Sequence, residues 1–121
     1  MSTDQKRVVV IGGSSGIGAA IAKKYSTAAC EVLATGATPA EVTAAQAREK
    51  GSNIGYAVLD VRDDFAVRAL LEGQEKIDVL VNCAGIVKRG EEHDLATFSS
   101  VIDINLTGTM RTCAAARAHL K

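Results

Sequence analysis

Four short apolar runs alternate with helical patterns along this chain, and this alternation limits the possible folds more than any other feature. The runs are RVVVI (7–11), EVLAT (31–35), IGYAVLD (54–60) and DVLVN (78–82). Most of them lack a polar–apolar alternation, as expected for strands that are buried on both faces. The connections between them are too long for hairpins, so we expect parallel strands joined by right-handed helical crossovers.

Capping residues mark the ends of the helices between these runs. Thr38 can cap the second helix, Pro39 suits its first position, and Glu41 can close a capping box. That helix is expected to end near Lys50, with Gly51 as a left-handed stop. The other helices are expected over 16–28, from a cap at Asp63 or Asp64 through Leu71 to Gly73, and from about Leu95 toward the end of the chain.

These elements predict an α/β fold: a Rossmann-type, doubly wound parallel sheet in a three-layer α/β/α arrangement that holds the first four strands. A length of 121 residues, without repeats or linkers, indicates a single domain over 1–121. Lys plus Arg and Asp plus Glu number 14 each, so no basic surface invites nucleic acid. No apolar run approaches the ~18 residues needed to span a membrane, so no membrane association is expected.

The three cysteines, Cys30, Cys83 and Cys113, are odd in number and widely spaced. They form no C-x-x-C pair, so the sequence predicts neither a disulfide framework nor a metal site. We expect small buried thiols in a cytoplasmic protein, because thiols stay reduced in that compartment.

A glycine-rich loop, GGSSGIG, joins the first apolar run directly to a helix. Gly12 can form the tightest point of this turn, and Gly16 would let a pyrophosphate approach the free N–H groups of the helix. Gly18 would let the helix lie close to the strand, while Ser14 and Ser15 can cap the helix or donate to phosphate. A plain glycine turn is the alternative, but the flanking strand and helix favour a bound nucleotide.

The loop spacing is G-x-x-x-G-x-G, with no G-K-S/T of a P-loop. It is followed in order by LDV (59–61), NCAG (82–85) and NLTG (105–108). With these motifs the chain resembles the short-chain dehydrogenase/reductase family. The resemblance implies an NAD(P)-dependent oxidoreductase that reduces a carbonyl or oxidises an alcohol by hydride transfer. It also implies a small-molecule alcohol or carbonyl substrate and assembly as a homo-oligomer.

The resemblance also assigns roles to individual residues. Asp60 would accept a hydrogen bond from the adenine amino group, and Asn105 would take a catalytic role by holding a water in a proton relay. Without the resemblance, Asp60 reads as a residue that ends a strand, and Asn105 as a surface or packing residue. The cofactor-binding residues implied are Gly12, Ser14, Ser15, Gly16, Ile17, Gly18, Gly36, Ala37, Asp60, Val61, Asn82, Ala84 and Gly85.

Several positions depart from the family pattern. Ile11 stands where the family usually has threonine, and Cys83 replaces the second asparagine of N-N-A-G. Ala29 occupies a position where glycine often ends the first helix. After the second apolar run, Gly36 and Ala37 offer neither the acid that binds the ribose of NAD nor the arginine that binds the phosphate of NADP. The sequence therefore leaves the choice between NAD and NADP open.

The family's general acid/base, Tyr-x-x-x-Lys, does not occur in this sequence. The resemblance places it, together with a serine, in a later part of the fold, so we expect this chain to be a cofactor-binding half that lacks the catalytic half. One alternative is a non-catalytic nucleotide-binding or interaction module complete at Lys121. Another is a different Rossmann-type enzyme such as a methyltransferase, which is disfavoured because Val10 and Ile11 stand where an acidic residue would be needed.

Overall fold

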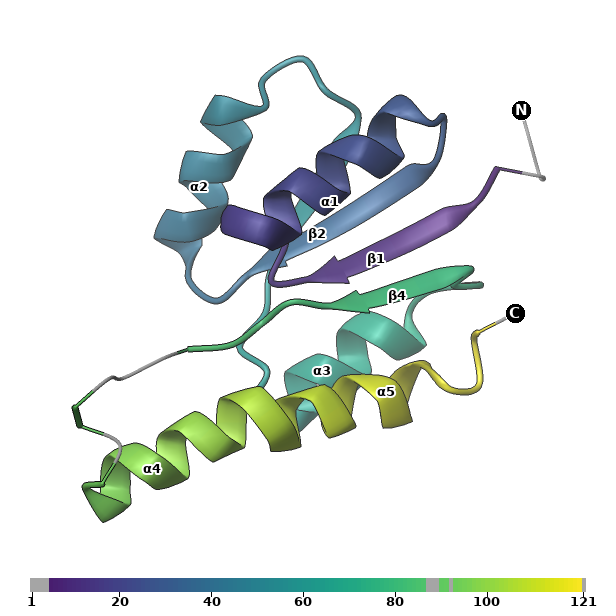
Figure 1. Ribbon diagram of the computed structural model, residues 1–121. Coiled ribbons are helices and arrows are strands. Elements are labelled where there is room, and N and C mark those ends of the chain that lie inside the picture. Colours follow the sequence, from purple (N-terminus) through teal and green to yellow (C-terminus); the bar gives the residue numbers. More distant parts are fainter. Residues whose placement is uncertain (1–4, 87–89, 92, 121) are drawn as a thin grey trace.

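The computed structural model describes residues 5–86, 90–91 and 93–120. It contains one parallel sheet in the order β3-β2-β1-β4 (Figure 1). In this sheet Val8 lies opposite Val32 on one side and Val79 on the other. The strands are β1 (Arg7–Ile11), β2 (Glu31–Gly36), β3 (Ile54–Val58) and β4 (Val79–Asn82). The predicted α/β, Rossmann-type sheet is thus confirmed.

Helices cover both faces of the sheet, which gives the three expected layers (Figure 1). The helices α1 (Gly16–Thr27) and α2 (Pro39–Arg48) lie on one face. The other face carries α3 (Asp64–Glu72) and α5 (Gly108–Ala116). The helix α4 (Leu95–Ile102) runs into α5 through the π-helical segment η1 (Asp103–Thr107). The sequence predicted this last helix but not its π-helical turn.

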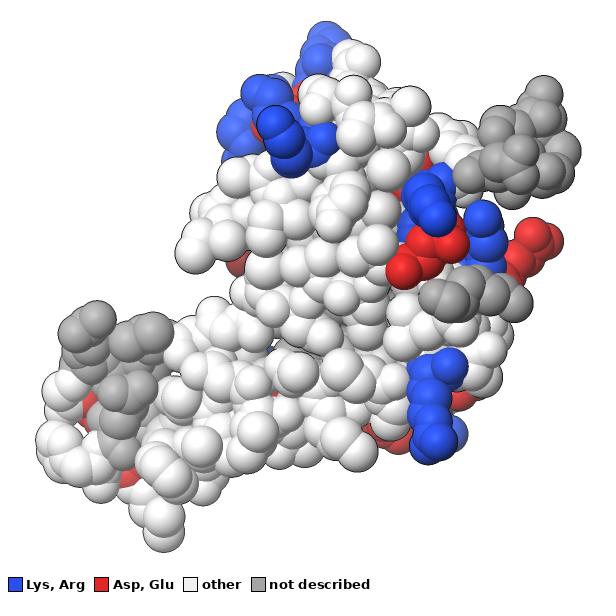
Figure 2. Space-filling view, turned by 45° about the vertical axis from the view of Figure 1, so that its right-hand side comes forward, with Lys and Arg blue, Asp and Glu red and all other residues white. Residues whose placement is uncertain are grey.

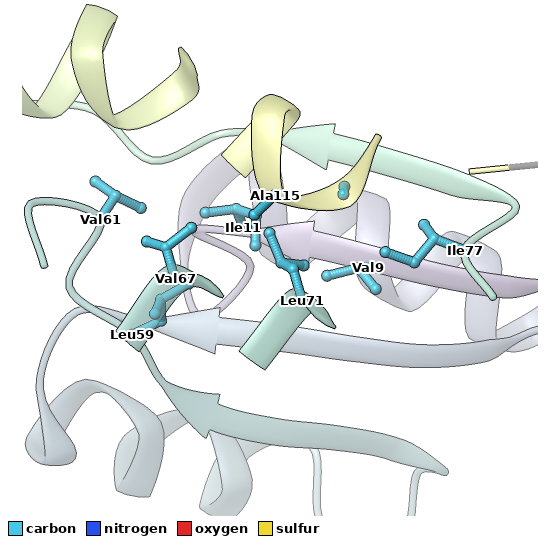
Figure 3. Packing of buried hydrophobic residues seen from close by; sticks show 9 residues of the cluster. Val9, Ile11, Leu59, Val61, Val67, Leu71, Ile77 and Ala115 are labelled. Atoms are coloured by element: carbon cyan, nitrogen blue, oxygen red, sulfur yellow. The ribbon is translucent and has the colours of Figure 1, made fainter. Parts of the chain in front are cut away.

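The residues of β1 alternate between two cores, because successive side chains of a strand point to opposite faces. Val8 and Val10 join the cluster beneath α1, together with Ala22, Val32 and Ala34. Val9 and Ile11 join the opposite cluster (Figure 3), which contains Val9, Ile11, Leu59, Val61, Val67, Leu71, Ile77, Ala115 and Ala116. All four valine and isoleucine side chains over 8–11 are essentially inaccessible, which explains the unbroken apolar run.

Most of the predicted helix ends are confirmed. Asp63 caps α3 by accepting a hydrogen bond from the Ala66 N–H. Gly51 follows α2 with a φ of +92°, and Ala29 follows α1 with a φ of +62°. The predicted capping box is only half formed: the Thr38 hydroxyl accepts from the Glu41 N–H, but the Glu41 carboxylate accepts from that same hydroxyl instead of from a backbone N–H.

Two other expectations need correction. The third strand ends at Val58, two residues early, because Asp60 accepts hydrogen bonds from the N–H groups of Arg62 and Asp63 and so bends the chain into a turn. The three thiols are free, but only Cys30 is buried, and Cys113 is exposed on α5. Within the described ranges, no helix is both long and apolar enough to cross a bilayer.

Candidate cofactor-binding site

A cavity of about 400 Å³ opens at the carboxyl ends of the strands. In an open parallel sheet, ligands bind at this edge, where the chain connections switch from one face to the other. Here the switch lies between β1 and β4, which are neighbours in the sheet although three helices separate them along the chain. The cavity is lined by Gly12, Ser14, Ser15, Gly16, Ile17, Gly18, Thr35, Gly36, Ala37, Thr38, Glu41, Leu59, Asp60, Val61, Arg62, Cys83, Ala84, Gly85, Ile86 and Ile104.

The cavity brings together all of the predicted cofactor-binding residues except Asn82. The Asn82 side chain instead faces α5, where its Oδ1 accepts a hydrogen bond from the Thr112 hydroxyl at 2.5 Å. Its Nδ2 lies 3.5 Å from the Cys113 sulfur. Asn82 therefore joins β4 to α5, and it acts on the cavity only through the position of the strand.

The three glycines of the motif serve different purposes. A Cβ on Gly12 would lie 2.5 Å from the Ala84 backbone nitrogen, and its φ is +80°. A Cβ on Gly18 would collide with the Gly12 carbonyl oxygen, so this glycine allows α1 to lie against the loop that follows β1, where the sequence predicted a close approach to the strand itself. Gly16 also has a positive φ, +58°, but a Cβ there would meet nothing within 4 Å. Open space at Gly16 leaves the backbone accessible to a ligand.

The N-terminus of α1 is prepared for an anion. Ser15 is the N-cap residue in an extended conformation, and its side chain makes no capping hydrogen bond within the part of the chain that the structure describes. Ser15, Gly16 and Ile17 are exposed at the cavity. The first N–H groups of the helix and its dipole therefore point toward solvent, and a pyrophosphate fits this position.

Thr35 at the end of β2 holds the start of the glycine loop. The Gly12 N–H donates to the Thr35 hydroxyl at 3.1 Å, and the Gly13 N–H donates to the Thr35 carbonyl at 2.8 Å. Thr35 is buried, so both bonds are shielded from water. The side chain and the backbone of one β2 residue thus hold the glycine loop against the strand.

Asp60 and Arg62 form an ion pair at the turn after β3. The Arg62 guanidinium donates to both carboxylate oxygens of Asp60, at 2.7 Å from Nη2 to Oδ2 and 3.0 Å from Nε to Oδ1. The Arg62 backbone N–H adds a third bond to Oδ1 at 3.0 Å. These side-chain and backbone hydrogen bonds hold the pKa of Asp60 below its usual value, although partial burial opposes them. Asp60 is therefore ionised at neutral pH, and an adenine amino group would have to share Oδ2 with Arg62.

Arg111 holds this turn from the opposite side. Its Nη1 donates to the Val61 carbonyl oxygen at 2.9 Å, and its Nη2 donates to the Asp103 carboxylate at 2.7 Å. The Arg111 side chain is about one-fifth exposed. One guanidinium thus links the turn beside the cavity to α5 and to the first residue of η1.

Asn105 lies in η1 and fixes the loop that follows β4. Its Oδ1 accepts from the Ile86 N–H and its Nδ2 donates to the Ile86 carbonyl, both at 2.8 Å. Asn105 does not line the cavity itself, but Ile86 does. Asn105 therefore acts on the cavity wall through Ile86, from a π-helical turn of a kind that is frequent at functional sites.

Other residues of the cavity were not assigned from the sequence. Arg62 follows Asp60 by two positions, and Thr35 is a lone hydroxyl at the end of an apolar strand. Both features are visible in the sequence and could have marked these residues as part of the site. The sequence identified Glu41 only as a capping residue, not as a residue of the site. The remaining additions are Thr38, Leu59, Cys83, Ile86 and Ile104, which enter the lining as neighbours of predicted residues. Among the residues described, no group of three or more His, Cys, Asp and Glu side chains could hold a metal ion.

The family model described as short chain dehydrogenase matches residues 6–121. The chain belongs to this family. D-threitol dehydrogenase of Mycolicibacterium smegmatis is 39% identical over 121 residues, which cover 93% of this chain and 46% of that protein. Human 3-hydroxyacyl-CoA dehydrogenase type-2 is 38% identical over 114 residues, which cover 84% of this chain and 43% of that protein.

Solved structures of the short-chain dehydrogenase family share the fold. The crystal structure of 2-keto-3-deoxy-D-gluconate dehydrogenase from Streptococcus agalactiae superposes with a TM-score of 0.82 at 28% identity. The match covers 98% of this chain and 47% of that one. The chain therefore spans less than half the length of each of these three relatives.

Proposed function

We propose that this chain forms the cofactor-binding part of an NAD(P)-dependent oxidoreductase, which transfers hydride between a nicotinamide cofactor and a small alcohol or carbonyl substrate. The observation that carries the proposal is one cavity that joins the glycine loop, the Asp60 turn and the residues after β4. Membership of the short-chain dehydrogenase family supports it. Its relatives named above are dehydrogenases.

Each part of the cavity has a proposed task. The N–H groups of Gly16 and Ile17 bind the pyrophosphate, and Asp60 with Val61 binds the adenine. Asn82 holds β4 in register from behind, and Ala84 and Gly85 line the other end of the cleft. When bound, the nicotinamide ring supplies or accepts the hydride. We assign the proton transfer to residues outside 1–121, with Asn105 holding a water in the relay.

The names of the relatives support the proposed substrate class. One is named for D-threitol and another for a 3-hydroxyacyl-CoA. Both names support a substrate that carries a hydroxyl group in its reduced form. The choice between NAD and NADP does not follow from these names.

A homo-oligomer in the cytoplasm, as expected from the sequence, is part of the same proposal. Large apolar side chains are exposed along the α4–η1–α5 helix, namely Leu95, Phe98, Leu106 and Met110. Figure 2 shows few charged side chains over this helix on the face in view. An exposed apolar helical surface of this kind is typical of a protein–protein contact, and we propose a second copy of the protein as the occupant.

Two glycines provide a matched test of the cofactor site. Gly16 and Gly51 both have a positive φ, and a Cβ on either meets nothing within 4 Å, but only Gly16 lines the cavity. In the full-length protein, Gly16→Val is expected to weaken NADH and NADPH binding more than tenfold, or by about 1.4 kcal/mol. Gly51→Val carries similar backbone strain and is expected to leave binding unchanged. If calorimetry gave the same cofactor affinity for both variants, the glycine loop would not be part of the cofactor site.

A further inference from the structure

We propose that Glu41 makes the ribose end of the cavity reject a 2′-phosphate, so that the protein uses NAD(H) in preference to NADP(H). The inference rests on the proposed function, because it concerns the cofactor of that same cavity. In Rossmann folds the residues just after the second strand contact the adenosine ribose. Here Gly36 and Ala37 carry no charge, but Glu41 lines the same cavity from the first turn of α2.

The Glu41 carboxylate is held at this position. Its Oε2 accepts a hydrogen bond from the Thr38 hydroxyl at 3.0 Å, and that hydroxyl accepts in turn from the Glu41 N–H at 3.2 Å. Both side chains line the cavity. The Glu41 carboxylate at the cavity wall can accept hydrogen bonds from ribose hydroxyls bound beside it, whereas it would repel a phosphate dianion at the same place.

The N-terminus of α2 has little capacity left for a phosphate. Helix N-termini bind phosphate through free N–H groups, but Pro39 has none. The Glu41 N–H is used by the Thr38 hydroxyl, and the Val42 N–H donates to the Thr38 carbonyl at 3.2 Å. Of the first four residues of this helix, all of which the structure describes, only Ala40 keeps an N–H outside these bonds.

Nearby cations are already engaged. Arg62 is the one Lys or Arg among the described residues that line the cavity, and it is bonded to both oxygens of Asp60. Arg48, at the far end of α2, donates to the Ser14 carbonyl at 2.6 Å and pairs with Glu49 at 3.4 Å. A 2′-phosphate would thus meet a carboxylate and would have to break an existing ion pair or hydrogen bond to gain a positive partner.

The test compares NADH and NADPH by calorimetry on the full-length protein at low ionic strength. We expect the wild-type protein to bind NADH at least tenfold more tightly than NADPH. Glu41→Gln is expected to bind NADPH more tightly and so to reduce the ratio of the two affinities at least fivefold. Glutamine keeps an acceptor for the Thr38 hydroxyl, so α2 is expected to stay capped. Glu72→Gln, which removes a charge at the end of α3, is the control and is expected to keep the wild-type ratio.

Three results would overturn the inference. The first is that the wild-type protein binds NADPH as tightly as NADH or more tightly. The second is that the ratio of NADH to NADPH affinity is the same in Glu41→Gln as in the wild type. The third is that Arg48→Gln selectively loses NADPH binding, which would make Arg48 the phosphate ligand. Failure of the proposed function looks different, because then neither cofactor binds to the wild-type protein. Binding of both cofactors with equal affinity would leave the proposed function standing and refute only the role of Glu41.

Discussion

At the turn after β3, a spacing of two residues lets Arg62 bond to both oxygens of Asp60. The pair lies at the cavity surface, with the Asp60 side chain 38% exposed. Solvent screening therefore keeps the contribution of this pair to stability small. Its main effect is to fix the direction of the Asp60 carboxylate at the cavity surface.

The lowered pKa of Asp60 gives a prediction with a defined pH window. A carboxyl whose pKa is depressed on folding stabilises the folded state fully above its unfolded pKa of about 3.9, and this contribution is lost as the pH falls through the folded value. We expect Asp60→Asn to lower the free energy of unfolding slightly at neutral pH. The difference from the wild type should vanish in strong acid, as measured by urea denaturation at several pH values. A difference that persists undiminished at low pH would show that the carboxylate charge is not its cause.

Among the elements, the helix from α4 to α5 does the most to join the parts of the site. Its π-helical segment carries Asn105, which bonds to the loop after β4, and its next turns carry Arg111, which bonds to the turn after β3. Gly108 lies between them, where a Cβ would approach Val61 to 2.6 Å. The geometry of one helix therefore sets the relative position of two walls of the cavity.

Removal of Arg111 tests this link. Arg111→Met keeps much of the aliphatic side chain but loses the bonds to Val61 and Asp103, so we expect a loss of about 1–2 kcal/mol in the free energy of unfolding. We also expect weaker binding of NADH, because the Val61 turn is no longer fixed. Arg117→Met, at the exposed end of α5, is the control for the loss of positive charge. Unchanged stability and affinity in Arg111→Met would show that the link has no energetic role.

The element order could be predicted because apolar runs and capping residues act locally. The side chains of Val8 to Ile11 are buried on both faces of the sheet, so an unbroken apolar run marks this strand. Thr38 and Pro39 start a helix through contacts within its first turn, which do not depend on the rest of the fold. The π-helical turn could not be predicted, because it depends on packing of η1 against distant loops. The contacts of Arg62, Arg111 and Glu41 with the cavity walls also depend on the folded arrangement, and a sequence pattern does not define them. The direction of the Asn82 side chain could not be predicted for the same reason, because its partner Thr112 is 30 residues away.

On the scale of the whole molecule, the sheet order places β4 at one edge of the described sheet. Ile77, just before this strand, donates its N–H to the His119 carbonyl at 2.8 Å, and it forms a parallel bridge with Leu120. The residues of β4 are only partly buried. An apolar strand edge and the exposed helix face described above are both surfaces that a neighbouring chain can cover.

We therefore expect a polypeptide of residues 1–121 alone to self-associate and to show no hydride transfer. The full-length protein is expected to sediment as a defined oligomer and to be active. Sedimentation velocity on both, with a nicotinamide absorbance assay, measures this. The double substitution Leu106→Glu and Met110→Glu shows which of the two surfaces drives association. It should reduce self-association if the helix face is responsible and leave it unchanged if the edge of β4 is responsible. A monodisperse 1–121 monomer would favour the non-catalytic module instead.

The central claim, that the cavity at the carboxyl edge of the sheet holds a nicotinamide dinucleotide, is tested most directly by a crystal structure of the full-length protein grown with NADH. We predict the pyrophosphate within about 2.7–3.2 Å of the Gly16 and Ile17 N–H groups. The adenine should lie beside Asp60, and the nicotinamide should lie next to residues 84–86. An ordered dinucleotide bound elsewhere, with the glycine loop free of phosphate, would contradict the account.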